Sequence, residues 1–190
     1  MATDRLERAT TPKGVAMYPW LTKPDTKWSV EGVYKMSLSV ANDDKEALAL
    51  CDKIRDLYTD EFGNKKMAKA IMPFKDDGEG NIVFSFKSKK KPNLFNAKGN
   101  PVKNTEDLKI GGGSIVKVNC SINPYDKGIN TGVALYLNAV QIIELVEFKS
   151  KSAFGDEGGS FTDEGSDEDD APTPKKKATT VDEEEEDSEF

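Results

Sequence analysis

A tyrosine and a lysine on one predicted strand have the chemistry to bind a single-stranded nucleic acid. Residues 113 to 125 alternate between apolar and polar types, so Lys117 and Tyr125, an even number of positions apart, fall on the polar face. An exposed ring can stack on a base, which is worth about 1–3 kcal/mol, while an ammonium group pairs with the neighbouring phosphate. The alternative is that Pro124 and Tyr125 only begin a turn, with the ring lying over the edge of the fold.

A run of lysines offers further positive charge. Lys87, Lys89, Lys90 and Lys91 form the strongest local cluster, although such a run can equally be a solvated loop. If about six ammonium groups contacted phosphates, affinity would fall about a thousandfold between about 50 and 200 mM salt. Strong salt dependence is therefore expected if these lysines bind a polyanion.

Aromatic residues near the amino terminus can either pack in a core or stack on a base. Trp20, Trp28 and Tyr34 all lie close in sequence to lysines. Packing is favoured for each of the three, and most for Tyr34, because it shares a strand face with Met36, whereas Lys35 lies on the opposite, polar face.

The carboxyl-terminal segment is a run of acid that ends on an aromatic ring, Asp182–Phe190. Of the 34 acidic and 27 basic residues, 15 acidic and three basic residues lie from Gly155 onward, a net charge of −12, which leaves +5 in residues 1–154. A basic body suits polyanion binding, and an acidic tail could occupy the same surface when no polyanion is present. A solubilising tail on an unrelated domain is the alternative.

The composition argues against an enzyme, a metal site and a membrane protein. The chain has no histidine, which removes the usual general base and the commonest metal ligand. Cys51 and Cys120 are far apart, and Gly111–Gly113 lacks the Gly-Lys-Ser/Thr ending of a nucleotide loop. No stretch approaches the roughly 18 apolar residues of a membrane span. We expect no catalysis, no cofactor and no metal, and a location in a reducing cytoplasm.

The elements that must position these residues are strands and one helix. Period-two alternation predicts strands at 32–40, 82–87, 113–125 and 132–148, and in the last of these Ala139 is expected on the face of Leu135 and Val140 on the face of Tyr136. Asp43 is expected to cap a helix of about five turns, ending near residue 63. The four strand ranges are four of at least five strands that we expect. With one inserted helix and no βαβ rhythm, they favour a small, partly open antiparallel barrel.

Three regions follow from these patterns. Residues 1–14 are polar and basic without periodicity and are expected to be a flexible N-terminal arm. Residues 15–152 form one domain of typical size. Residues 153–190 are rich in Gly, Ser and acid, and they are expected to be a disordered acidic C-terminal tail, because they bury too little apolar surface to offset the entropy of ordering.

Several short motifs occur in an order that resembles the single-stranded DNA-binding proteins of podovirus bacteriophages. They are Lys23-Pro24-Asp25, Gly32-Val33-Tyr34-Lys35, the Gly78–Asn81 turn before Phe84-Ser85-Phe86-Lys87, Gly111-Gly112-Gly113-Ser114, Pro124-Tyr125, and the acidic tail ending in Phe190. The resemblance covers nearly the whole chain. It implies a mainly β fold: a five-stranded antiparallel oligonucleotide/oligosaccharide-binding (OB) barrel with one inserted α-helix and a disordered acidic tail.

The resemblance also implies a function. Such a protein binds single-stranded DNA without sequence preference in phage DNA replication, recombination and repair, and it anneals complementary strands in the cytoplasm of the infected bacterial host. The tail recruits the phage DNA polymerase and helicase-primase and competes with DNA. A homodimer is implied, with no membrane association. The tail residues concerned are Asp182, Glu183, Glu184, Glu185, Glu186, Asp187, Glu189 and Phe190.

Carried over by position, Tyr125 matches the base-stacking tyrosine and Lys117 a groove lysine. The next basic position of the family's strand is Asn119 here, a departure that leaves more of the phosphate contact to other lysines, Lys109 among them. The expected DNA-binding residues are therefore Tyr125, Lys117, Asn119, Lys109, Lys87, Lys89, Lys90, Lys91, Lys35, Trp20 and Trp28.

Two other functions remain compatible with the residues. An acidic-tailed chaperone for basic proteins would use the tail as its binding element, and an OB-type RNA chaperone would use the same rings and charges, since stacking and charge barely sense the 2′-hydroxyl. Lys175–Lys177 interrupt the tail, and they either divide it into two acidic blocks or form a linker.

Overall fold

A computed structural model describes residues 6–27 and 30–147. The predictions for Trp28, for Lys175–Lys177 and for the acidic tail lie outside the described residues. By contacts within the chain, residues 1–151 and 152–190 form separate units.

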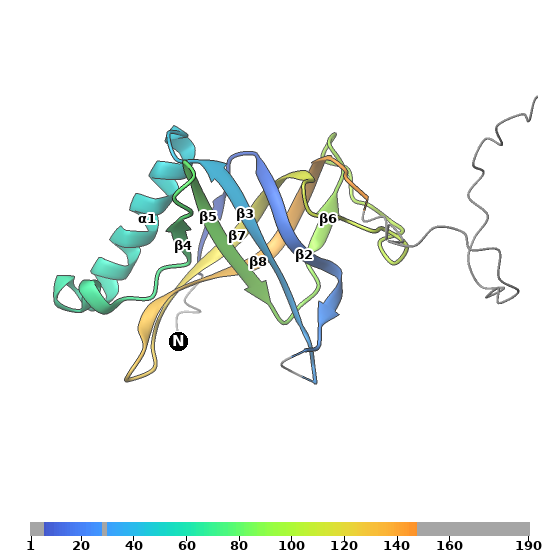
Figure 1. Cartoon of the computed structure of the whole chain (residues 1–190). Helices are drawn as coiled ribbons and strands as arrows, with labels where there is room; N and C mark the ends of the chain where they lie inside the picture. The colour runs from blue at the N-terminus through green and yellow to red at the C-terminus, as the bar shows by residue number, and fades with distance from the viewer. Residues whose placement is uncertain (1–5, 28–29, 148–190) are drawn as a thin grey trace, which may run out of the picture. The chain divides into compact units, whose positions relative to one another are not determined.

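Five long strands make up the barrel (Figure 1). They are β2 (Gly14–Asp25), β3 (Val33–Ala41), β5 (Asn81–Ser88), β7 (Ile115–Asp126) and β8 (Thr131–Glu144), and the short strands β1 (Glu7–Thr10), β4 (Phe74–Asp76) and β6 (Asn93–Phe95) pair at their edges. The ring runs β7-β2-β3-β5-β8 and closes where β8 pairs with β7. This confirms the predicted barrel with one correction: β5 and β8 pair in parallel, through Phe86–Leu135 and Lys87–Tyr136.

The predicted alternation holds along β3, β5 and β7. On β7, Val116, Val118 and Ile122 are buried in the core while Lys117 and Asn119 are partly exposed. Burying one face of each strand against the others is the main favourable term for such a barrel.

The predicted faces of β8 are wrong beyond Leu137. Asn119 pairs with Ala139 and Cys120 with Leu137, so Asn138 is an extra residue, a β-bulge. The bulge turns Val140 into the core, where it is fully buried, and leaves Ala139 on the outer face with Tyr136. A bulge is set by the register of the partner strand, which period-two reading within one strand cannot detect.

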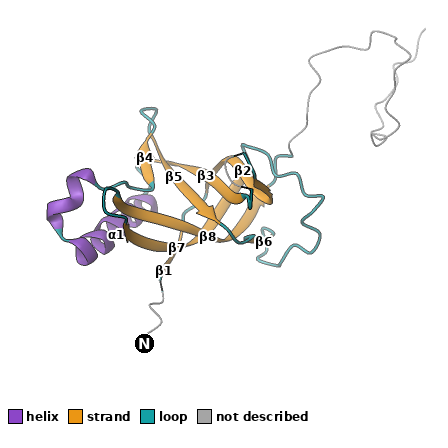
Figure 2. Cartoon of the chain, turned by 90° about the horizontal axis from the view of Figure 1, so that it is seen from below, coloured by secondary structure: helices purple, strands orange, loops and turns teal. Residues whose placement is uncertain are grey.

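Helix α1 (Lys45–Phe62) lies at one end of the barrel and β6 at the other, as Figures 1 and 2 both show. Its N-cap is Asp44, one residue after the predicted Asp43: the Oδ1 of Asp44 accepts a hydrogen bond from the Ala47 amide at 2.8 Å. The helix ends at Gly63, followed by a short 3₁₀ helix, η1 (Asn64–Lys69). The buried Tyr58 hydroxyl donates to Thr131 Oγ1 at 2.9 Å, which ties α1 to the start of β8.

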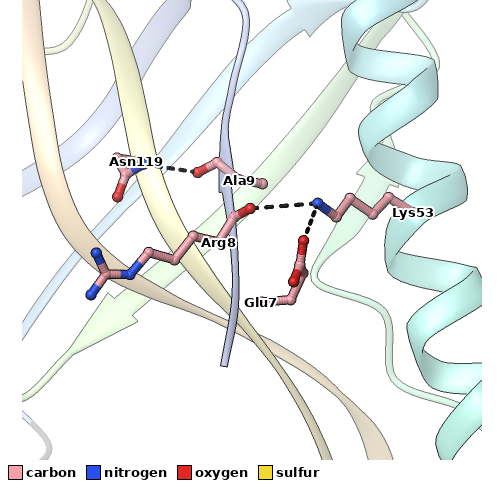
Figure 3. A network of polar contacts seen from close by, with 5 residues as sticks. All are labelled: Glu7, Arg8, Ala9, Lys53 and Asn119. Carbon is pink, nitrogen blue, oxygen red and sulfur yellow. Dashed lines mark hydrogen bonds and ion pairs between the residues drawn. The ribbon is translucent and has the colours of Figure 1, made fainter. Parts of the chain in front are cut away.

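Residues 7–10, which we expected to belong to a flexible arm, form β1 along the edge of β7. Figure 3 shows how β1 is held on both sides: Lys53 Nζ of α1 contacts Glu7 Oε1 at 2.7 Å, and Asn119 Nδ2 of β7 donates to the Ala9 carbonyl at 3.3 Å. Because backbone groups at a sheet edge need partners, even four residues without alternation can pair there.

Candidate nucleic-acid interface

A groove of about 480 Å³ opens on the outer face of β3 and β5. In an OB barrel these are the second and third strands, the face that binds oligonucleotides. Side chains and backbone from β2, β3, β5, β7, β8 and the 71–73 segment line it: Tyr18, Lys35, Met36, Ser37, Ile71, Met72, Pro73, Ser85, Phe86, Lys87, Tyr125, Val133, Ala134 and Leu135. The groove thus combines two tyrosines and two lysines with an apolar floor.

Tyr125 stands at the β8 side of the groove, near the end of β7. It pairs with Gly132, and a Cβ built on that glycine would lie 3.0 Å from the Tyr125 hydroxyl and 2.3 Å from the Ile71 carbonyl oxygen. Only glycine leaves room for both neighbours. The alternative that Tyr125 only begins a turn does not describe it, since the residue lies within the strand and lines the groove.

Tyr18 lies on β2, at the opposite side of the groove, and the sequence reasoning did not identify it. It is 75% exposed. Among the described residues other than glycine, Tyr18 is the one with a positive φ, +49°. Such a backbone costs about 1–3 kcal/mol, and strain of this kind clusters at functional sites. The β2–β3 register shifts between Met17 and Trp20, so Tyr18 sits in a bulge. The Tyr18–Pro19 dipeptide within a strand was the available signal.

Two predicted lysines meet in the groove. Lys35 on β3 lies directly opposite Lys87 on β5, an arrangement that is unfavourable for like charges. Asp25 relieves it, since its Oδ2 lies 2.5 Å from Lys35 Nζ. The hydrogen bond from Lys35 and then the backbone N–H of Lys27 lower the pKa of Asp25 below its usual value. A phosphate placed between the two lysines would relieve the same repulsion.

Trp20 is not one of the residues that line the groove, but it is the register partner of one that does. It is 43% exposed and lies across from Lys35 in the β2–β3 register. Its ring is therefore neither fully packed nor remote from the cations.

The other predicted residues that the structure describes also lie outside the groove. Lys117 is eight residues before Tyr125, about 26 Å along the strand, and it pairs with Gln141. Asn119 is engaged with β1, and Lys109 lies in the exposed loop that precedes Ile110. Within the 89–91 run, Lys89 contacts Glu31 at 3.1 Å and Lys91 donates to Thr105 Oγ1 at 2.9 Å, while Lys90 is exposed.

The cysteines are unsuited to chemistry. Burial raises the pKa of the Cys51 thiol to about 11 and that of Cys120 to about 12, so neither is a thiolate at neutral pH. Over residues 6–27 and 30–147, no cluster of three metal-ligating side chains occurs. Of the helices in this part of the chain, none is long and apolar enough to cross a bilayer.

Comparison with known proteins identifies relatives at the level of both sequence and fold. No family model matches the chain. The single-stranded DNA-binding protein of Enterobacteria phage T3 is 29% identical, over 80% of this chain and 77% of its own length. The protein of the same name from Escherichia phage T7 is 29% identical, over 69% and 72%. The crystal structure of gp2.5, a single-stranded DNA-binding protein of bacteriophage T7, superposes with a TM-score of 0.65 and 26% identity over 83% of this chain and 100% of that one.

The chain is similar in both sequence and fold to the T7-like phage single-stranded DNA-binding proteins. This similarity to T7-like proteins confirms the predicted fold and the expectation that the chain is not an enzyme. The single-stranded DNA-binding protein of bacteriophage Enc34 in complex with single-stranded DNA shares the fold, with a TM-score of 0.59 at 18% identity over 74% of this chain and 88% of that one.

Proposed function

We propose that this protein binds single-stranded DNA without sequence preference, in the groove between Tyr18 and Tyr125. The observation that carries the proposal is the convergence of two tyrosines and of Lys35 and Lys87 on the oligonucleotide-binding face of an OB barrel. Rings accept any base, and ammonium groups accept any phosphate. Besides the two ammonium groups, the side chains of the lining that can form hydrogen bonds are the hydroxyls of the two tyrosines and of Ser37 and Ser85.

A single strand fits this groove better than a duplex does. Its bases are free to turn toward the rings, whereas the bases of a duplex are stacked and paired inside the helix. The two rings stand on opposite sides of a floor built from β3, β5 and β8, so a base entering the groove can meet a ring from either side.

We further propose that the protein acts in phage DNA replication, recombination and repair and in strand annealing within the host cytoplasm, as a homodimer. The acidic tail, residues 153–190, occupies the groove of the same or the partner subunit when no DNA is bound. It therefore competes with DNA for the groove. The tail also recruits the phage DNA polymerase and helicase-primase. The opposite charges of body and tail support this, because the tail can replace phosphates on a basic surface.

The experiment is a salt titration of single- and double-stranded DNA binding, on the full chain and on a chain ending at residue 152. We expect the full chain to prefer the single strand, and truncation to tighten binding and steepen its salt dependence. Equal affinity for the duplex would contradict single-strand binding. Unchanged affinity after truncation would contradict competition between tail and DNA, but it would leave single-strand binding itself standing.

RNA binding is the second candidate, because the groove presents rings and charges that barely sense a 2′-hydroxyl. Oligomers of DNA and RNA with equal sequence compare the two directly. A chaperone for basic proteins would instead retain partner binding when Tyr125 is replaced by alanine.

A further inference from the structure

The registers of five neighbouring strand pairs join into one row of residues across the barrel. Trp20 lies opposite Lys35, Lys35 opposite Lys87, Lys87 beside Tyr136, Tyr136 opposite Ser121, and Ser121 opposite Arg8. Directly paired residues lie on the same face of a sheet, and neighbouring strands are about 4.8 Å apart. The row therefore continues about 14 Å beyond Lys87, over three strand spacings, to Arg8.

Tyr136 is the ring in this extension. It is 38% exposed, and its neighbours Leu135 and Leu137 are buried in the core, so the side chain stands on the outer face. The Tyr136 hydroxyl accepts a hydrogen bond from Asn123 Nδ2 at 3.1 Å, which fixes the ring from one end while its body stays accessible. A held, half-exposed ring beside a lysine offers a stacking surface for a base and a charge for the neighbouring phosphate.

Ser121 contributes only a short side chain to the row, between Tyr136 and the amino-terminal strand. The serine is buried, and its Oγ accepts a hydrogen bond from Asn138 Nδ2 at 2.8 Å. The β8 bulge at Asn138 brings that amide across to β7. No long side chain of the row thus stands between Tyr136 and Arg8.

Arg8 ends the row on a strand that is anchored from both sides. Along β1, Glu7 points to α1 and contacts Lys53, and Arg8 points the opposite way, toward β7 and β8 (Figure 3). Lys53 Nζ also donates to the Arg8 carbonyl at 3.5 Å, and Asn119 holds the carbonyl of Ala9. An exposed guanidinium on a fixed backbone suits bidentate binding of a phosphate.

We propose that the bound single strand leaves the groove at Lys87, stacks a further base on Tyr136 and places a phosphate on Arg8. This extension rests on the proposed function, since it lengthens the path of the same ligand. It also gives β1 a role: the strand carries a phosphate contact to the far end of the path.

The test compares a short and a long oligothymidylate, about 4 and about 16 nucleotides, which span the range of site sizes for an OB fold. On the full-length protein, we expect Tyr136→Ala to weaken binding of the long oligomer at least fivefold more than binding of the short one. Tyr136→Phe is the matched control and should retain long-oligomer affinity. The salt slope is the steepness with which the logarithm of the binding constant falls against the logarithm of the salt concentration. Arg8→Gln should reduce this slope for the long oligomer by about 0.7, while Arg8→Lys should retain it.

The outcomes separate the extension from the groove itself. If Tyr125→Ala weakens both oligomers but Tyr136→Ala and Arg8→Gln affect neither, the path does not extend and the proposal is overturned. Equal losses for the short and long oligomers in Tyr136→Ala would also overturn it, since Tyr136 would then act within the groove. If the unchanged protein fails to bind either oligomer, the proposed function itself fails.

Discussion

The hydroxyl of Tyr125 occupies space that a side chain at residue 132 would need: a Cβ on Gly132 would lie 3.0 Å from it. The two residues are paired across the β7–β8 hairpin, so the position of the ring depends on the missing side chain of its partner. The same glycine admits the 71–73 segment, whose Ile71 carbonyl accepts the Val133 amide at 3.0 Å. One glycine thus sets both a ring and a floor segment of the groove.

Gly132→Ala should therefore damage both stability and binding. The added methyl group would lie 2.3 Å from the Ile71 carbonyl oxygen and must push the segment or the tyrosine aside. We expect the free energy of unfolding to fall by about 1–3 kcal/mol, a typical cost of overpacking, and single-strand affinity to fall with it. Chemical denaturation measures the first effect; no loss of stability would mean that the 71–73 segment yields freely. Gly112→Ala, where the added Cβ would meet only the Ala16 carbonyl oxygen at 3.8 Å, is a control for replacing a glycine.

Tyr18→Gly should raise stability and lower affinity. Glycine adopts a φ of +49° without the strain that tyrosine bears there, so unfolding should cost about 1 kcal/mol more. The exposed ring is lost from the groove, and affinity for a single strand should fall about fivefold or more. Chemical denaturation of this variant checks the rise in stability, and DNA titration checks the fall in affinity. Tyr18→Phe keeps the ring and should bind normally; a Tyr18→Gly variant with full affinity would remove Tyr18 from the interface.

Asp25→Asn should strengthen DNA binding. The change frees Lys35 for phosphate while an amide oxygen can still accept the Lys27 backbone N–H, which lies 2.9 Å from Asp25 Oδ1. One additional free cation should steepen the salt slope by about 0.7. Titration at two salt concentrations measures the change. An unaltered slope would indicate that Lys35 contacts phosphate while still paired with Asp25.

The Asp25–Lys35 pair should also contribute a defined pH dependence of stability. The folded-state pKa of Asp25 is lowered below 3.8, so the ionised form stabilises the fold above pH 3.8 and its contribution is lost as the pH falls through the lowered pKa. Urea midpoints of the wild type and Asp25→Asn should therefore differ above pH 3.8 and converge below it. A difference that is constant across this range would contradict the ionic origin of the effect.

Alternation within single strands predicted the core faces of β3, β5 and β7 and placed Tyr125 on the outer side. The features that alternation did not predict depend on residues of neighbouring strands. Tyr18 is displayed by a bulge against β3, Val140 is turned inward by the bulge at Asn138, and Glu7–Thr10 become a strand only beside the free edge of β7. Lys117 shares a strand face with Tyr125, yet eight residues of extended chain separate them, because a shared face says nothing of distance.

The affinity of Tyr125→Ala for oligothymidylate, beside the wild type and Tyr125→Phe, tests the central claim most directly. If a single strand stacks on Tyr125, the alanine variant should bind at least fivefold more weakly at the same salt concentration, while the phenylalanine variant binds nearly as the wild type does. Its salt slope should stay the same, because no phosphate contact is removed. An alanine variant that melts like the wild type and binds with full affinity would contradict single-strand binding in this groove.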